Sequence, residues 1–128
     1  MAKIHNPQLT ITTDPNQNAA TVVATCDVDL TDFERNAMEL LGLRYTVECV
    51  VLNRDLQYEQ AVLGYDAQSL SAGLPVAHIA FEAVTPMSDL HQHVFTRDEL
   101  VAEFTLTNGE SGSQEVVRSD VVKADLVA

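Results

Sequence analysis

The sequence is poor in basic residues, with two lysines and five arginines against 19 acidic residues in 128. The lysines, Lys3 and Lys123, lie near the two ends, and the arginines are spread singly along the chain. Nucleic acids and anionic membranes are bound mainly through clustered Lys and Arg side chains. We therefore expect the chain to bind neither. The formal net charge of -12 is interpreted first as a solubilising surface, with a basic partner or a cation as alternatives.

Motifs that mark common enzyme classes are also missing. The five glycines are scattered rather than gathered in a phosphate-binding loop, and no Cys-x-x-Cys pair or Gly-x-Ser-x-Gly elbow occurs. Ser88, Asp89 and His91 are neighbours in the sequence, but the residues of a catalytic triad usually come together from separate elements. The sequence therefore favours a protein that is not an enzyme, and it predicts no cofactor.

Long apolar runs are absent as well. No segment approaches the roughly 20 apolar residues needed to span a bilayer, and residues 1–7 carry no apolar stretch that would make a secretory signal. We expect a soluble, cytoplasmic protein. The length and the 46% hydrophobic content are those of a single globular domain, here residues 1–128.

Apolar and polar residues alternate with a period of two over much of the chain, as they do in half-buried strands. Residues 8–30 form a predicted hairpin around a turn at 14–18. In its second strand the predicted inward set is Val22, Ala24, Cys26, Val28 and Leu30. Further strands are expected over 43–51, 61–70, 78–84, 94–107 and 115–127. The predicted inward set of the strand at 94–107 is Leu100, Ala102, Phe104 and Leu106.

One segment, residues 32–41, has helical rather than strand signals. Thr31 and Glu34 stand at the spacing of a capping box, and Gly42 is placed to end the helix. Phe33, Ala37, Leu40 and Leu41 could form one apolar stripe on this helix. Together these patterns predict a mainly β protein: an antiparallel β-sandwich of the immunoglobulin type with seven to eight strands and a short helical connection near 32–41. The buried tryptophan typical of antibody domains is absent.

Three groups of residues are candidates for chemistry. Cys26 and Cys49 both fall on inward-facing strand positions, where we expect buried thiols; a disulfide is the alternative if the two strands pair. His91 and His93 form a His-x-His pair with Met87 nearby, a thioether and imidazole set suited to copper or zinc. Surface histidines without a ligand are the simpler interpretation of that pair.

The third group is acidic, and it lies where the hairpin ends and the helix begins. Its members are Asp27, Asp29, Asp32 and Glu34, whose carboxylates could bind calcium. Their spacing does not follow the EF-hand pattern. A solvated strand face and a negatively charged first helical turn explain the same residues without a metal.

The preferred functional hypothesis is a non-enzymatic protein-interaction or assembly module. A sandwich exposes strand edges that can pair with another protein or with a second copy of itself. Because lysines are so few, we expect these edges to lack the lysines that usually prevent such pairing. The alternative hypothesis is a metal-binding domain that uses His91, His93 and Met87, or the acidic group.

Overall fold

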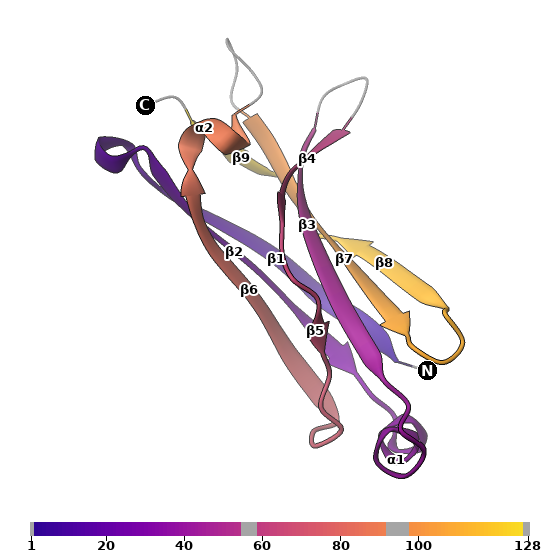
Figure 1. Cartoon of the computed structure of the whole chain (residues 1–128). Helices are drawn as coiled ribbons and strands as arrows, with labels where there is room; N and C mark the ends of the chain where they lie inside the picture. Colours follow the sequence, from indigo (N-terminus) through magenta and orange to yellow (C-terminus); the bar gives the residue numbers. More distant parts are fainter. Residues whose placement is uncertain (1, 55–58, 92–97, 127–128) are drawn as a thin grey trace.

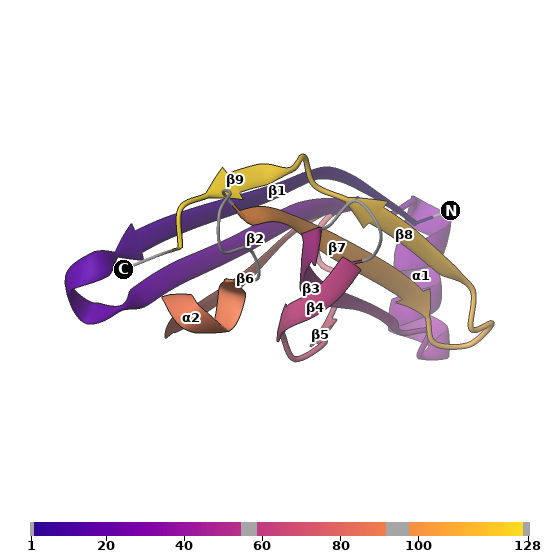
Figure 2. The ribbon, with the colours of Figure 1, turned by 90° about the horizontal axis from the view of Figure 1, so that it is seen from above.

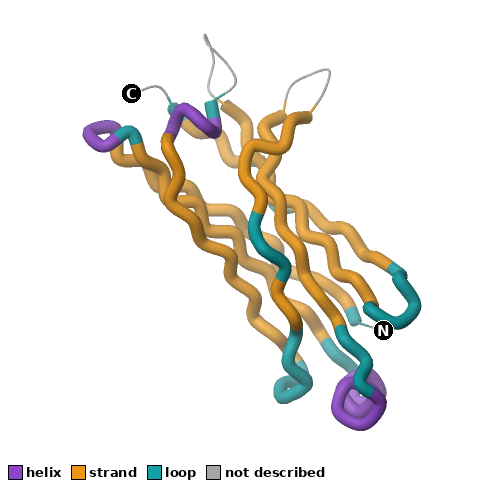
Figure 3. Tube along the Cα trace, in the orientation of Figure 1, coloured by secondary structure: helices purple, strands orange, loops and turns teal. Residues whose placement is uncertain are grey.

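The computed structural model describes residues 2–54, 59–91 and 98–126. Figure 1 shows long strands running along the molecule with a short helix toward each end, and Figure 3 shows how few loop residues separate them. The strands and helices of the described residues are β1 (Lys3–Asp14), the 3-10 helix η1 (Pro15–Gln17), β2 (Ala19–Asp29), α1 (Asp32–Leu41), β3 (Tyr45–Arg54), β4 (Glu59–Gly64), β5 (Gln68–Ser69), β6 (Val76–Pro86), α2 (Met87–Leu90), β7 (Asp98–Asn108), β8 (Gln114–Arg118) and β9 (Val122–Ala124).

The strands form two antiparallel sheets that pack face to face (Figure 2). Sheet A has the order β1-β2-β6, and sheet B has the order β4-β3-β7-β8, with β5 beside β3 and β9 beside β7. This is the A-B-E and C′-C-F-G arrangement of an immunoglobulin-type sandwich. The predicted fold class is confirmed. The described residues contain nine strands because each of the segments 61–70 and 115–127 is divided into two short strands.

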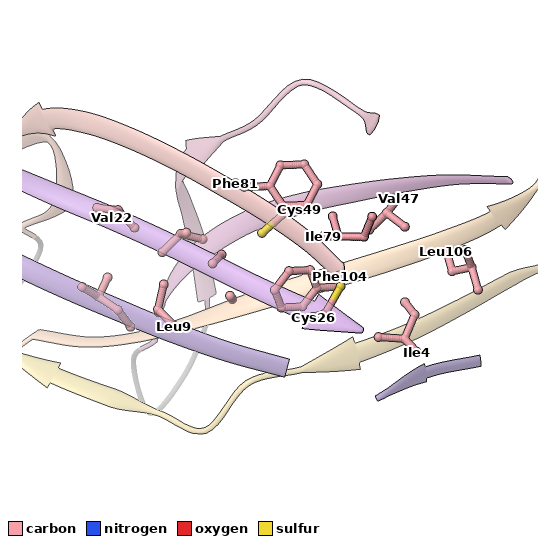
Figure 4. Packing of buried hydrophobic residues seen from close by; sticks show 14 of the residues in the cluster. Ile4, Leu9, Val22, Cys26, Val47, Cys49, Ile79, Phe81, Phe104 and Leu106 are labelled. Atoms are coloured by element: carbon pink, nitrogen blue, oxygen red, sulfur yellow. The ribbon is translucent and has the colours of Figure 1, made fainter. Parts of the chain in front are cut away.

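The core lies between the two sheets and is formed by the predicted inward positions of β2 and β7. Every member of both predicted inward sets is at most 5% exposed. Phe81 of β6 and Phe104 of β7 meet across the core with ring centroids 6.3 Å apart (Figure 4). The alternation in the sequence therefore predicted the buried face of these strands correctly.

Both cysteines lie in this core as free thiols, which confirms the first of the two interpretations. Cys26 is 1% exposed and Cys49 is 3% exposed. Burial raises the pKa of each thiol to about 12, because the apolar surroundings disfavour the thiolate. Both side chains therefore act as small apolar groups in the packing.

Helix α1 begins and ends as the sequence predicts, but its apolar stripe does not face the core. The capping box joins Thr31 to Glu34, and Gly42 ends the helix with a left-handed φ of 73°. Phe33, Leu40 and Leu41, however, are 79–80% exposed. Of the four residues that could form the stripe, only Ala37 is buried.

The face of α1 that packs against the sandwich carries Glu34 and Ala37 instead. The Tyr45 hydroxyl donates to the Glu34 carboxylate over 2.7 Å and ties this face to the start of β3. Since α1 lies at one end of the sandwich rather than across a sheet (Figure 1), little sheet surface is available to cover its other faces.

Candidate functional site

The outer edge of sheet A is formed by β6, and it is the longest regular edge of the described structure. Strand β6 pairs with β2 over 11 consecutive residues, from Val76 opposite Asp29 to Pro86 opposite Ala19, with no register shift. On its other side no strand pairs with β6 among the described residues. A long edge of this kind presents a row of unpaired backbone groups to a potential partner.

The direction of those backbone groups follows from the bonds at the two ends of the strand pair. Pro75 accepts a hydrogen bond from the Leu30 amide, and the Met87 amide donates to Asn18. In an antiparallel pair, residues that face the neighbouring strand alternate with residues that face away. The odd-numbered residues of β6 thus face β2, and the amides and carbonyls of His78, Ala80, Glu82 and Val84 face away from it.

One contact interrupts this outward row. The side-chain amide of Gln68 in β5 donates a 2.7 Å hydrogen bond to the Ala80 carbonyl. The donor is an exposed, flexible side chain rather than a strand, so it covers one position of the edge.

The remaining edges of the described sheets are shorter or irregular. Strand β1 has a register shift between His5 and Gln8, where Asn6 has a positive φ of 54°. In the pair of β4 with β3, the register shifts between Val51 and Leu52 of β3. Strands β8 and β9 are short, with five and three residues. Irregular or short edges resist pairing with other chains.

The two lysines lie on these other edges, which corrects the expectation that the edges lack them. Lys3 is the first residue of β1 and Lys123 lies in β9. Strand β6 has no lysine. A sequence alone could not show this, because it does not say which strands become edges.

The residues whose backbone groups face away from β2 also have their side chains on the solvent face of β6. One of these side chains is strongly apolar. Val84 is 70% exposed. His78 Nδ1 lies 2.5 Å from Oδ1 of Asp27 on β2, and this hydrogen bond is the main cause of a lowered pKa for Asp27, with burial opposing it. His78 is therefore held against its own sheet by one ring nitrogen.

The four acidic residues proposed for calcium take different positions. Asp27 binds His78, and Asp29 lies 3.2 Å from His5. Asp32 pairs with Arg35 at the surface of α1, whereas Glu34 is buried against Tyr45. In the described part of the chain, no three His, Cys, Asp or Glu side chains are grouped to hold a metal. The arrangement gives the calcium hypothesis no support.

The residues proposed to bind copper or zinc also differ in how far they are buried. Met87 is completely buried in the core, and His93 lies outside the described residues. His91 Nδ1 lies 2.6 Å from Oδ2 of Asp98, a carboxylate that is 1% exposed. A carboxylate only accepts hydrogen bonds, so in the neutral imidazole the proton lies on Nδ1 and the lone pair on Nε2.

Sequence reasoning missed Asp98 and its second partner, Asn53. The Asn53 side-chain amide donates to Oδ1 of Asp98 and to the Leu90 carbonyl. Its own Oδ1 is buried and has no hydrogen-bond partner among the described residues. Asn53 occupies an inward position of β3, so a polar residue in an apolar alternation was the available signal. His91 pairs with Asp98 rather than with Asp89, which is exposed on α2; the sequence neighbours Ser88 and Asp89 form no triad with it.

A shallow hollow of about 500 Å³ opens on sheet B, next to the gap between β4 and β5. Glu48, Asp66 and Glu103 contribute carboxylates to its lining, and Glu103 is already paired with Arg118. The hollow holds no group of three metal-binding side chains among the described residues. It gives no indication of a ligand. In addition, no helix in the described ranges has the length and hydrophobicity to cross a membrane.

Comparison with known proteins adds no functional information. No protein-family model and no curated protein matches the chain. Among solved structures, a structural genomics target, SoR45, is 8% identical with a TM-score of 0.43, covering 95% of this chain and 84% of the other. Spo0M, a sporulation control protein of Bacillus subtilis, is 10% identical with a TM-score of 0.44, covering 95% and 48%.

A β-glucuronidase of Bacteroides uniformis is 15% identical with a TM-score of 0.44, covering 91% of this chain and 12% of the enzyme. At these TM-scores the likeness carries no inference about function. Any inference about function must therefore come from the arrangement of residues in this chain.

Proposed function

We propose that this protein is a non-enzymatic interaction module that binds an extended segment of a protein partner at the edge of β6. The observation that carries this proposal is the uninterrupted 11-residue pairing of β6 with β2 on one side, with no strand on its other side in the part of the chain that the structure describes. An added strand would form backbone hydrogen bonds with the outward groups of His78, Ala80, Glu82 and Val84. Backbone bonds supply affinity in such strand addition, and the alternating side chains supply specificity.

The composition of β6 fits this role better than that of the other edges. It has no lysine and no internal proline, and it displays the apolar Val84 on its solvent face. Lysine, proline and bulges are the usual means by which edge strands avoid pairing. The acidic surface elsewhere disfavours non-specific association, so binding is directed to this edge.

The experiment measures peptide binding and amide protection together. An immobilised protein is exposed to a random peptide library, with the Glu82→Pro variant used for counter-selection. The amide of Glu82 faces away from β2, so proline there removes an outward donor and leaves the β2–β6 bonds intact. Val84→Lys is a second edge variant that keeps every backbone donor, and circular dichroism confirms that both fold.

Enrichment of peptides on the native protein, absent from both variants, supports the proposal. The enriched peptides should also slow hydrogen exchange at His78, Glu82 and Val84. The proposal is overturned if no peptide is enriched over the variants and these amides exchange at unprotected rates at every protein concentration.

A second candidate function, metal binding, is favoured by one contact. Asp98 holds Nδ1 of His91 and leaves Nε2 able to bind a metal, which is the usual arrangement of a carboxylate behind a metal-binding histidine. We propose His91 as a zinc or copper ligand, with His93 as the further ligand that the sequence predicts.

Thermal melting separates this candidate from the first. Zinc, copper and calcium are added separately; a metal at 100 times its dissociation constant stabilises the folded state by about 2.7 kcal/mol. The expected result is a higher melting temperature with zinc or copper that is lost in His91→Ala and kept in His78→Ala. No shift with zinc or copper sinks the candidate.

A further inference from the structure

We propose that the partner of the β6 edge is a second copy of this chain, paired antiparallel about a two-fold axis at Ala80. This inference rests on the proposed function, because it names the occupant of the same edge. It would join the two three-stranded A sheets into one continuous sheet across the axis. The order of residues along β6 favours this pairing.

That order is close to symmetrical about Ala80. In an antiparallel pair centred there, residues at equal distances from Ala80 lie opposite one another. The segment reads Val76, Ala77, His78, Ile79, Ala80, Phe81, Glu82, Ala83 and Val84. Valine therefore meets valine, alanine meets alanine, and isoleucine meets phenylalanine.

The charged positions are complementary rather than identical. His78 of each copy lies opposite Glu82 of the other copy, once on each side of the axis. His78 Nδ1 is already bound to Asp27, so Nε2 is the ring nitrogen that faces the other copy, and it donates to the Glu82 carboxylate when both ring nitrogens carry a proton. Opposite charges across neighbouring strands stabilise a pair, and like charges destabilise it.

The backbone groups have the direction that this register needs. His78, Ala80, Glu82 and Val84 all face away from β2, so the opposed residues are hydrogen-bonded pairs with Cα atoms about 5.5 Å apart. A register centred between two residues would oppose these outward groups to groups that already bind β2. The order of the side chains therefore selects Ala80 over a register centred on a neighbouring residue.

Two features oppose the dimer. The net charge of -12 on each copy repels the other, but at an ionic strength of 0.15 M this repulsion is screened over about 8 Å. The Gln68 side chain occupies the Ala80 carbonyl and has to turn away when the strands pair. Both effects weaken the dimer without blocking the edge.

The first test is sedimentation of the native chain at 0.15 M salt. A dimer is expected, with a dissociation constant raised about tenfold or more by Val84→Lys, because lysine at an edge disfavours strand pairing. Thr12→Lys, on the opposite edge of the same sheet, is the matched control and should leave the constant unchanged.

The second test reads the register by cross-linking. Ala80→Cys places two thiols across the axis at a separation within the roughly 4.4–6.8 Å range of Cα distances in disulfides. Mild oxidation should yield a covalent dimer. Val84→Cys, whose opposite residue is Val76, should not, and the native Cys26 and Cys49 are buried.

A monomer at all concentrations, an unaltered dimer in Val84→Lys, or equal cross-linking at positions 80 and 84 overturns self-pairing. If the chain is monomeric and peptides still protect the β6 amides, the proposed function stands and only the second copy is excluded. If peptides are not bound either, both proposals fall.

Discussion

The Tyr45 hydroxyl donates a 2.7 Å hydrogen bond to Oε2 of Glu34, and so joins the first residue of β3 to the first turn of α1. Tyr45→Phe removes this donor while it keeps the ring in place. Because the buried carboxylate then lacks one partner, the free energy of unfolding should fall by about 1–3 kcal/mol. Urea denaturation at pH 7 measures the change.

The matched control for that prediction is Tyr65→Phe. The Tyr65 hydroxyl donates to the neutral Val22 carbonyl over 2.8 Å, and a neutral bond contributes about 1 kcal/mol. A smaller loss in Tyr45→Phe than in Tyr65→Phe would contradict the charge-assisted character of the first bond.

The lowered pKa of Glu34 leads us to expect that the free energy of unfolding depends on pH. Burial opposes its ionisation, yet hydrogen bonds from Tyr45 and Thr31 lower its pKa from 4.5 to about 2. As the pH falls, the unfolded chain takes up this proton before the folded protein does. The stabilisation is thus complete above about pH 4.5 and is lost toward pH 2, by up to about 3 kcal/mol.

Glu34→Gln tests this pH dependence, since the amide does not titrate. Unfolding measured from pH 5 to pH 2 should show a shallower loss of stability in Glu34→Gln than in the native protein. Glu48→Gln, on the exposed face of β3, is the control and should retain the native slope. Identical slopes in all three proteins would contradict the prediction.

The two core thiols should be unreactive while the protein is folded. Cys26 and Cys49 are buried, and burial raises the pKa of each to about 12; the thiolate is the reactive form. A thiol reagent such as Ellman's should label neither residue at pH 8 and both in guanidinium chloride. The Val84→Cys variant should add one thiol that reacts at once, and rapid labelling of the native chain would refute the prediction.

The exposed apolar residues of α1 should contribute little to stability. Phe33→Gln and Leu40→Gln remove side chains that are 80% exposed, so the free energy of unfolding should change by no more than about 0.5 kcal/mol. Leu100→Ala, in the core, should cost about 2–5 kcal/mol. Chemical denaturation compares the three, and a loss above about 1 kcal/mol for Leu40→Gln would show that this face is covered.

Gln68 should act as a competitor for the β6 edge. Gln68→Ala frees the Ala80 carbonyl in both copies, so the proposed dimer should form about 30-fold more tightly, as expected from two neutral hydrogen bonds of roughly 1 kcal/mol each. Gln60→Ala, on the exposed edge strand β4, is the control. Sedimentation equilibrium gives both constants, and a weaker dimer in Gln68→Ala would show that this side chain supports pairing rather than competing with it.

The candidate sites were less predictable than the fold. Capping at Thr31 and Gly42 is a local property, so the helix ends could be read from the sequence. The burial of Glu34 instead of Phe33 depends on where α1 meets the sandwich, and no local pattern contains that information. Asp98 beside His91 is a contact formed by folding, which the neighbouring residues Asp89 and Ser88 did not reveal.

The sequence alone determined most of the strands, the inward faces of β2 and β7 and the ends of α1, because side-chain alternation and capping depend on residues close together in the chain. Only the tertiary structure decided which strands became edges, since that depends on long-range pairing. It placed Lys3 and Lys123 on β1 and β9 and left β6 without a lysine. The symmetry of β6 about Ala80 is present in the sequence. It indicates self-pairing only because the outward hydrogen-bonding groups of this strand have no neighbouring strand among the described residues.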